Sequence, residues 1–349
     1  MKNLKKITNL SLVIAMAAMV LFLNSCKEDD DTKPGTSTPA SYQGVFVINE
    51  GGFLKGNSSV DFYNPTSGEL SDDLFAKKNS RPLGDILQSM TKVGNKFYLI
   101  VNNSQKIEVV NAETFASTAT INNMGSPRFL LPLSSSGNKK AYVTDLFGGV
   151  IHIVDLDAAT KTGSITLPGW SEHMVEVGTD VYVNNWSNKM VYEINSTNNT
   201  VADSITLTGA PNGLVKDKNG KLWVLVDSVG TTQARFIRVN PSNNSVEATV
   251  LFPAGQSASK LAINGSGDKL YYTSSTGVYE MDITASTLPA TAKKAGYFYG
   301  LGVDPKDGSV YVTDALDFNQ KGIVYRLKTD GTESNFKVGI VPGGFFFNY

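Results

Sequence analysis

A stretch of sequence that repeats itself limits the folds open to this chain more than any other feature. A segment beginning at Ala141 recurs without gaps about 40 residues later, so that Tyr142 aligns with Tyr182 and Leu167 with Leu207. Each copy contains short apolar runs separated by polar turns, a pattern that is typical of β-strands. Self-similarity at this spacing predicts a fold built from repeated structural units.

The same start of a strand, an aromatic residue among apolar neighbours, occurs seven times at intervals of about 40–50 residues. The seven aromatic markers are Phe46, Tyr98, Tyr142, Tyr182, Trp223, Tyr271 and Tyr311. Units of this length that contain only strands and turns are typical of propeller blades. The sequence therefore predicts an all-β fold, a seven-bladed β-propeller of four-stranded antiparallel blades.

The two ends of the repeat array indicate how the ring closes. The first marker, Phe46, lies in what would be the second strand of a blade, and no inner strand precedes it. The C-terminus has one strand too many, because residues 342–349 repeat the proline-led start of an inner strand. We expect residues 345–349 to supply the inner strand of the first blade, which would remove the open sheet edges.

Composition and charge exclude some partners. The net charge is −1 at pH 7, so nothing favours binding to nucleic acid or to an anionic membrane surface. The 32 glycines and the low share of charged residues, 18%, suit tight turns and half-buried strands. We assign residues 42–349 to the propeller domain.

The first 25 residues have the pattern of a lipoprotein signal peptide. Lys2, Lys5 and Lys6 precede a short apolar run, which ends in Leu-Asn-Ser before Cys26, the only cysteine. A single cysteine cannot form a disulfide within the chain. We expect cleavage before Cys26 and acylation there, so that the membrane is reached only through the lipid anchor. The alternative is a cleaved signal peptide followed by an incidental cysteine.

Residues 26–41 are predicted to form an acylated, flexible tether. Residues 27–31 (KEDDD) resemble the acidic export tag of surface lipoproteins, although a simple solvated charge run is the alternative. The Pro, Thr, Ser and Gly content of residues 32–41 is typical of a linker. These features together predict an outer-membrane protein that is lipid-anchored and exposed at the cell surface.

The predicted loops differ between the two faces of the ring. Loops on one face are short, regular turns, whereas loops on the other face break the repeat and combine aromatic, amide and charged residues. Such a mixture is typical of a recognition surface. The predicted ligand-binding residues on this face are Phe53, Arg81, Asn103, Arg128, Phe129, Phe147, Trp170, His173, Asn185, Trp186, Asn212, Lys260, Tyr299 and Phe318.

Catalytic motifs are missing from the sequence. Of the two histidines, His152 lies in a strand and is interpreted as structural, whereas His173 beside Glu172 could bind, titrate or be structural. No nucleophile elbow, phosphate loop or zinc-protease motif occurs. We therefore expect no catalytic residues, no enzymatic activity and no cofactor. The alternative is a calcium ion, because Ca²⁺ prefers oxygen ligands. The candidate ligands are Asp314, Asp317 and Asn319 in one loop, and Glu50, Glu172 and Asn212 at one channel mouth.

Two resemblances extend this interpretation. From about residue 44 to the end, the repeats resemble the YncE-like propeller superfamily. Residues 47–53 (VINEGGF), 56–65 (GNSSVDFYNP) and 219–225 (NGKLWVL) resemble the BtuG-like surface lipoproteins, which are found with TonB-dependent transporters. This resemblance implies capture of cobalamin (vitamin B12) outside the cell and delivery to an outer-membrane TonB-dependent transporter.

Three functions remain open from the sequence. The first is non-enzymatic capture of cobalamin or a related bulky solute, since a corrin ring fringed with amides suits aromatic and amide side chains. The second is a propeller that binds a protein or a glycan of the cell envelope. The third is a calcium-dependent, lactonase-like hydrolase, because residues 210–213 resemble a metal-binding stretch of lactonase-type propellers.

Overall fold

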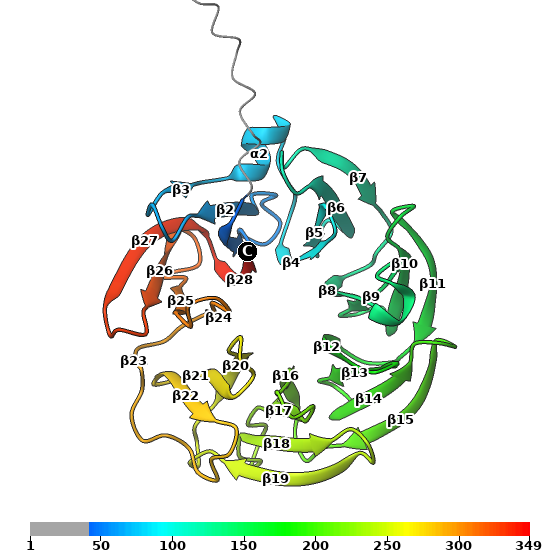
Figure 1. Ribbon diagram of the computed structural model, residues 1–349, viewed down its shortest axis with the longest axis vertical. Helices are drawn as coiled ribbons and strands as arrows, with labels where there is room; N and C mark the ends of the chain where they lie inside the picture. The colour runs from blue at the N-terminus through cyan, green and yellow to red at the C-terminus, as the bar shows by residue number, and fades with distance from the viewer. Residues whose placement is uncertain (1–41) are drawn as a thin grey trace, which may run out of the picture. The chain divides into compact units, whose positions relative to one another are not determined.

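Seven four-stranded sheets form a closed ring in the computed structural model, which describes residues 42–349. Every pairing within the sheets is antiparallel, and the blades follow one another around the ring (Figure 1). The predicted seven-bladed β-propeller is therefore confirmed. The predicted signal peptide, the acylated Cys26 and the tether lie outside the described residues. None of the helices in the described part of the chain has the length and apolarity needed to cross a membrane.

The strands are grouped here by their distance from the centre of the ring (Figure 1). The innermost strands are β28 (Pro342–Asn348), β4 (Leu87–Val93), β8 (Pro127–Pro132), β12 (Ser171–Val177), β16 (Pro211–Lys216), β20 (Ala258–Ile263) and β24 (Gly300–Val303). The second strands are β1 (Gly44–Asn49), β5 (Lys96–Val101), β9 (Lys140–Asp145), β13 (Asp180–Asn185), β17 (Leu222–Val226), β21 (Lys269–Ser274) and β25 (Val310–Asp314).

The third and outer strands complete each blade. The third strands are β2 (Ser59–Tyr63), β6 (Lys106–Asn111), β10 (Val150–Asp155), β14 (Met190–Asn195), β18 (Arg235–Asn240), β22 (Gly277–Asp282) and β26 (Lys321–Leu327). The outer strands are β3 (Leu70–Ser71), β7 (Ser117–Ile121), β11 (Thr160–Thr166), β15 (Thr200–Thr206), β19 (Ser245–Leu251), β23 (Lys294–Ala295) and β27 (Glu333–Ile340). A short 3-10 helix, η1 (Ser134–Ser136), follows β8.

The C-terminal strand closes the ring as predicted. β28 pairs with β1, so the first blade has the order β28-β1-β2-β3. Phe46 faces Phe346 across this pair, and the ring of Phe346 packs against Phe97 of the second blade with centroids 5.9 Å apart. The last strand of the chain therefore joins its first strand and also contacts the neighbouring blade.

All seven aromatic markers lie in the second strands and are buried. Three of them also hold neighbouring blades together through hydrogen bonds from their hydroxyl groups. Tyr98 donates to the carbonyl of Leu156 (3.1 Å), Tyr142 to Oδ1 of Asn199 (2.7 Å), and Tyr182 to the carbonyl of Pro241 (2.9 Å). The acceptor lies in the next blade each time, so these three hydroxyl groups connect neighbouring blades.

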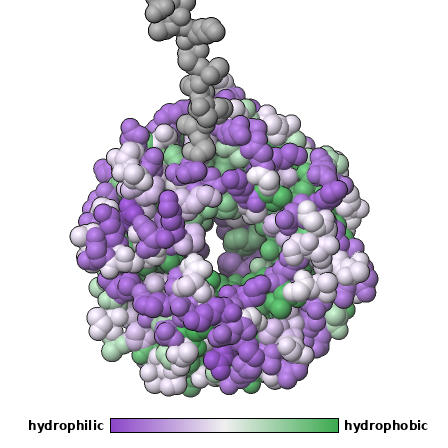
Figure 2. Space-filling view, viewed as in Figure 1, coloured by the Kyte–Doolittle hydropathy of each residue, from purple (hydrophilic) through white to green (hydrophobic). Residues whose placement is uncertain are grey.

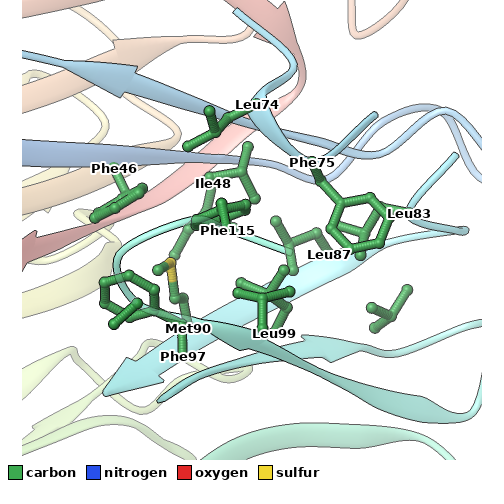
Figure 3. Packing of buried hydrophobic residues seen from close by; sticks show 14 residues of the cluster. Phe46, Ile48, Leu74, Phe75, Leu83, Leu87, Met90, Phe97, Leu99 and Phe115 are labelled. Carbon is green, nitrogen blue, oxygen red and sulfur yellow. The ribbon is translucent and has the colours of Figure 1, made fainter. Parts of the chain in front are cut away.

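One helix interrupts the repeat between the first two blades. α2 (Leu74–Asn79) follows the two-residue strand β3 and buries Leu74 and Phe75 in the apolar cluster that contains Phe46 and Phe97 (Figure 3). Asp73 caps its N-terminus by accepting a hydrogen bond from the Ala76 amide (3.3 Å). The helix takes the place of most of an outer strand, which accounts for the longer first interval of the repeat.

The two faces of the ring carry different loops. We call rim face the one formed by the loops between second and third strands and by the junctions between blades. Hydrogen bonds connect these two kinds of loop. The Trp186 amide donates to the Trp170 carbonyl (2.8 Å), and the Leu54 amide donates to the Asp85 carboxylate (2.9 Å). The opposite face, the turn face, carries the remaining short turns. The ring has a hollow at its centre (Figure 2).

Candidate ligand-binding rim

β-bulges at the rim ends of the innermost strands direct side chains toward the channel mouth. Six of the seven innermost strands show a register shift there against their second strands. In an antiparallel pair the extra residue is left unpaired, and bulges are common next to active sites because they re-aim a side chain. The residues within these shifts are Gln88, Arg128, Phe129, Glu172, His173, Asn212, Ser259 and Gly343.

Three exposed aromatic side chains form one cluster on the rim face. Phe147, Trp170 and Trp186 are 66%, 41% and 38% exposed. The indole rings of Trp170 and Trp186 stack with centroids 5.1 Å apart, and the Phe147 ring meets Trp170 edge-on at 5.7 Å. Exposed aromatic groups that are held by one another offer a broad apolar surface at little conformational cost.

A pocket of about 240 Å³ opens beside this aromatic cluster. Its walls combine apolar and polar side chains. The lining residues are Leu146, Phe147, Trp170, Glu172, Asn184, Trp186, Pro211 and Asn212. A mostly apolar concave site with a few polar groups is the usual form of a small-molecule pocket.

A group of charged side chains adjoins the pocket at the channel mouth. Arg128 donates from Nη2 to Oε1 of Glu172 (2.9 Å) and from Nη1 to Oε1 of Gln88. Its Nε is buried and has no partner within residues 42–349. A buried donor without a partner costs about 1–3 kcal/mol, so this group is suited to a ligand or a water molecule.

Glu50 and Tyr299 lie at the same channel mouth. Tyr299 donates its hydroxyl to Oε2 of Glu50 (3.0 Å), and Nζ of Lys260 lies 5.2 Å from the centre of the Tyr299 ring. Burial raises the pKa of Glu50, although Lys260, the Tyr299 hydrogen bond and Arg128 act in the opposite direction. Burial also raises the pKa of Tyr299, and the Glu50 charge adds to this effect.

His173 is held neutral between its neighbours. Its ring stacks on Phe129, with centroids 4.4 Å apart and an interplanar angle of 29°. Burial lowers the pKa of His173 to about 4, Glu172 counteracts this effect, and the positive charges of Lys260 and Arg128 add to it. Its Nδ1 is buried without a partner in the described chain. A neutral imidazole in this position can accept or donate one hydrogen bond.

A second aromatic contact lies elsewhere on the rim, in the last blade. Phe318, in the loop between β25 and β26, meets Tyr299 edge-on at 5.2 Å and is 43% exposed. Phe53, in the loop between β1 and β2, is exposed as well. The predicted aromatic residues are therefore distributed over several blades of the same face.

Three predicted ligand-binding residues have internal partners. Arg81 pairs with the buried Glu108 (2.6 Å) and donates to Ser117 of the outer strand β7, away from the channel. Asn103 donates to Asp85 (2.5 Å) within the rim loops. Asn185 is fully buried and binds the carbonyl of Pro168 (3.0 Å), so it holds the loop that carries Trp186.

Glu50, Glu172 and Asn184 belong to this site although they are absent from the predicted ligand-binding residues. The sequence had suggested the two glutamates only as oxygen ligands for a cation. Asn184 aligns with Thr144 of the preceding repeat. This replacement of a hydroxyl by an amide is the feature of the sequence that could have identified Asn184 as a site residue. Within residues 42–349 no three His, Cys, Asp or Glu side chains are grouped so that they could hold a metal ion.

The loop suggested for calcium is arranged differently. The Asp317 carboxylate accepts hydrogen bonds from the backbone amides of Asn319 and Gln320, both at 3.0 Å. Asp314 accepts from the Leu316 amide (2.8 Å). Both carboxylates therefore stabilise the turn that carries Phe318.

Comparison with known proteins shows the family to which this chain is similar and the fold that it shares with solved structures. The family model described as "Domain of unknown function (DUF5074)" matches residues 43–335. No curated protein matches the chain in sequence.

Solved structures of the same fold include proteins named as lactonases. The periplasmic gluconolactonase PpgL of Pseudomonas aeruginosa is 12% identical, with a TM-score of 0.65 over 87% of this chain and 99% of that chain. A provisionally named 6-phosphogluconolactonase of Bacteroides fragilis is 14% identical, with a TM-score of 0.64 over 90% and 99%. Another from Bacteroides uniformis is 12% identical, with a TM-score of 0.62 over 88% and 99%. At such identities the likeness shows the fold alone.

These structures correct one expectation from the sequence. The prediction that the protein is not an enzyme is contradicted by structural neighbours that are named as enzymes. That prediction rested on the lack of linear catalytic motifs. In a propeller, however, the groups at the channel mouth come one or two from each blade, as Glu50, Arg128 and His173 do here. A search for motifs of consecutive residues therefore cannot detect such a group of residues.

Proposed function

Since this chain belongs to the family described as "Domain of unknown function (DUF5074)", we propose its function from the rim itself. It captures a broad solute that is fringed with amides, of which cobalamin is the example, and passes it to an outer-membrane TonB-dependent transporter. The observation that carries the proposal is the exposed cluster of Phe147, Trp170 and Trp186, which lines a pocket together with a few polar side chains.

The chemistry of the rim suits such a solute. Apolar area removed from water contributes about 25 cal/mol per Å², so a corrin ring laid against the exposed aromatic cluster would gain several kcal/mol. Trp170 and Trp186 are already stacked on each other, which lowers the cost of ordering them on binding. Asn184 and Asn212 in the adjoining pocket provide amide groups for the edge of the ligand.

The position of the described N-terminus is compatible with a surface lipoprotein. β1 starts at Gly44 on the turn face and ends at Asn49 before the rim loop that contains Phe53. The described chain thus enters the ring on the face opposite the rim loops. The anchor, the outer-membrane location and the transporter are parts of this proposal.

Calorimetric titration of the full chain with cyanocobalamin tests capture. We expect saturable binding, and we expect Trp170→Ala or Trp186→Ala to weaken it at least about tenfold, the equivalent of 1.4 kcal/mol. Leu251→Ala is the control, because Leu251 is an exposed apolar residue of the outer strand β19. A folded protein that gives no binding heat with cyanocobalamin at micromolar concentration would refute the proposal.

A second candidate function, lactone hydrolysis, is favoured by the charged group at the channel mouth and by the names of the structural neighbours. Burial raises the pKa of Glu50, which favours its use as a general acid toward a leaving alkoxide. The neutral His173 can accept a proton from an attacking water molecule. Arg128 and Lys260 provide positive charge for the oxyanion that forms on the carbonyl oxygen.

Proton release from gluconolactone in a pH-stat tests this second candidate. If the channel mouth is catalytic, Glu50→Gln and His173→Asn should each lower the enzyme-dependent rate at least about a hundredfold, the usual contribution of a general acid or base. Glu69→Gln, which changes an exposed carboxylate near the turn between β2 and β3, should leave the rate unchanged. A rate equal to the spontaneous one, or one that survives both channel substitutions, removes this candidate.

A further inference from the structure

Asn184 places an unpaired hydrogen-bond acceptor in the wall of the aromatic pocket. Its side chain is 1% exposed, and its Nδ2 donates to the carbonyl of Pro211 (3.1 Å). Because a carbonyl can only accept, this bond fixes which end of the Asn184 amide carries the oxygen. Oδ1 has no partner among residues 42–349 although Asn184 lines the pocket. An N–H or O–H donor of a ligand that reaches Oδ1 from the pocket would therefore remove the cost of this unpaired acceptor.

Glu172 provides a further acceptor in the same wall. Within residues 42–349 only its Oε1 takes part in hydrogen bonds, with Arg128 (2.9 Å). Its Oε2 can accept a second hydrogen from the same ligand group. The Arg128 charge offsets that of Glu172, and His173 beside it is neutral. The pocket wall thus has acceptors without a large excess of negative charge.

Asn212 lies on the bulge of β16, immediately after Pro211, whose carbonyl holds Asn184. Its half-buried amide lines the pocket and can donate through Nδ2. Two acceptors and one donor thus lie around one cavity of about 240 Å³. Trp170, Trp186 and Phe147 provide apolar lining to the same cavity.

From this arrangement we propose that the pocket is a site for a primary carboxamide carried on a flat, apolar body. The NH₂ of the ligand donates to Asn184 and Glu172, its carbonyl accepts from Asn212, and its apolar body lies against the indole rings. The inference deepens the proposed function and rests on it for the identity of the larger solute. The pocket then recognises a carboxamide group of that solute.

The site discriminates against the corresponding carboxylate. A ligand carboxylate would place its oxygens opposite Asn184 Oδ1 and the charged Glu172, where it has no hydrogen to donate. A site that forms hydrogen bonds to one group of a ligand strongly rejects analogues that lack this group, because its own polar groups are then left unpaired.

Benzamide, benzoate and benzamidine test the proposal, because they share one shape and differ only in donors, acceptors and charge. Binding to the full chain is measured from line broadening of the ligand signals in NMR spectra and from quenching of tryptophan fluorescence. We expect benzamide to bind at least about tenfold more tightly than benzoate. Equal binding of the two, or no saturable binding of benzamide, overturns the proposal.

Asn212→Asp supplies the decisive variant. It replaces the donor of the pocket by a third, charged acceptor, so benzamide binding should fall at least about tenfold while benzamidine binding rises. Asn319→Asp, the same change at an exposed rim loop of the last blade, should alter neither. Matching melting temperatures establish that both variants fold. If Asn212→Asp leaves the ratio of benzamide to benzamidine binding unchanged, the pocket does not recognise carboxamides.

Cyanocobalamin distinguishes this proposal from the broader one. If the vitamin binds wild type and Asn212→Asp equally, capture stands and the carboxamide site is wrong. If benzamide binds and depends on Asn212 while cyanocobalamin does not bind, the carboxamide site stands and the assignment of the vitamin is wrong.

Discussion

Single residues at the rim show how far chemistry can be inferred from residue type. Arg81 and Arg128 have the same side chain in similar sequence positions, each near the start of an inner strand. Arg81 nevertheless turns outward to the buried Glu108, whereas Arg128 lies in a bulge and reaches Glu172 at the channel mouth. Residue type alone could not separate them, because the direction of each side chain depends on the local register.

Glu50 leads to a prediction about pH. Because burial raises its pKa in the folded protein, the folded state binds a proton more tightly than the unfolded state does. Stability is then lost as the pH rises from the unfolded pKa, near 4.5, through the raised folded value. Glu50→Gln removes this loss, so its melting temperature should exceed that of wild type by more at pH 8 than at pH 4.

The measurement is thermal unfolding of both proteins across this pH range, and Glu69→Gln serves as the exposed control. Glutamine can still accept the hydrogen bond from Tyr299, so the contact made by Glu50 Oε2 is preserved. A difference in melting temperature between Glu50→Gln and wild type that stays constant with pH would show that Glu50 does not titrate as described.

At the scale of secondary structure, β28 is the element on which closure depends. Without it, the hydrogen-bonding groups along one side of β1 would form an open sheet edge. Phe346 would also be lost from the apolar cluster around Phe46 and Phe97. We therefore expect a chain that lacks residues 342–349 to aggregate, or to melt at least about 10 °C lower, in thermal unfolding and size-exclusion experiments.

Removing Tyr349 alone is the matched control for that deletion. This residue lies beyond the end of β28, is 43% exposed and donates to Asp304 (2.5 Å). Its loss should lower the melting temperature far less than the loss of the whole strand. A chain without residues 342–349 that melts like wild type would refute closure by β28.

Over the whole molecule, the contrast between the two faces connects the fold with the proposed function. Charged, amide and imidazole side chains from several blades meet at the rim, because bulges occur at the same end of six innermost strands. Turn-face loops, by contrast, use their polar side chains to hold their own backbone, as Asn64, Asn111 and Asp155 do. A solute bound on the rim would thus contact several blades at once.

The repeat, the number of blades and the closing strand followed from the sequence alone. The repeat reflects local strand and turn preferences together with the burial of one aromatic residue in each blade. All of these recur at regular intervals along the chain, so they can be recognised in the sequence. The grouping of Glu50, Arg128, Glu172 and His173, and the unpaired oxygen of Asn184, were decided only by the tertiary structure. Glu50 and Arg128 lie far from the neighbouring residues Glu172 and His173 in sequence. Bulges and blade-to-blade packing determine which of these side chains share a site.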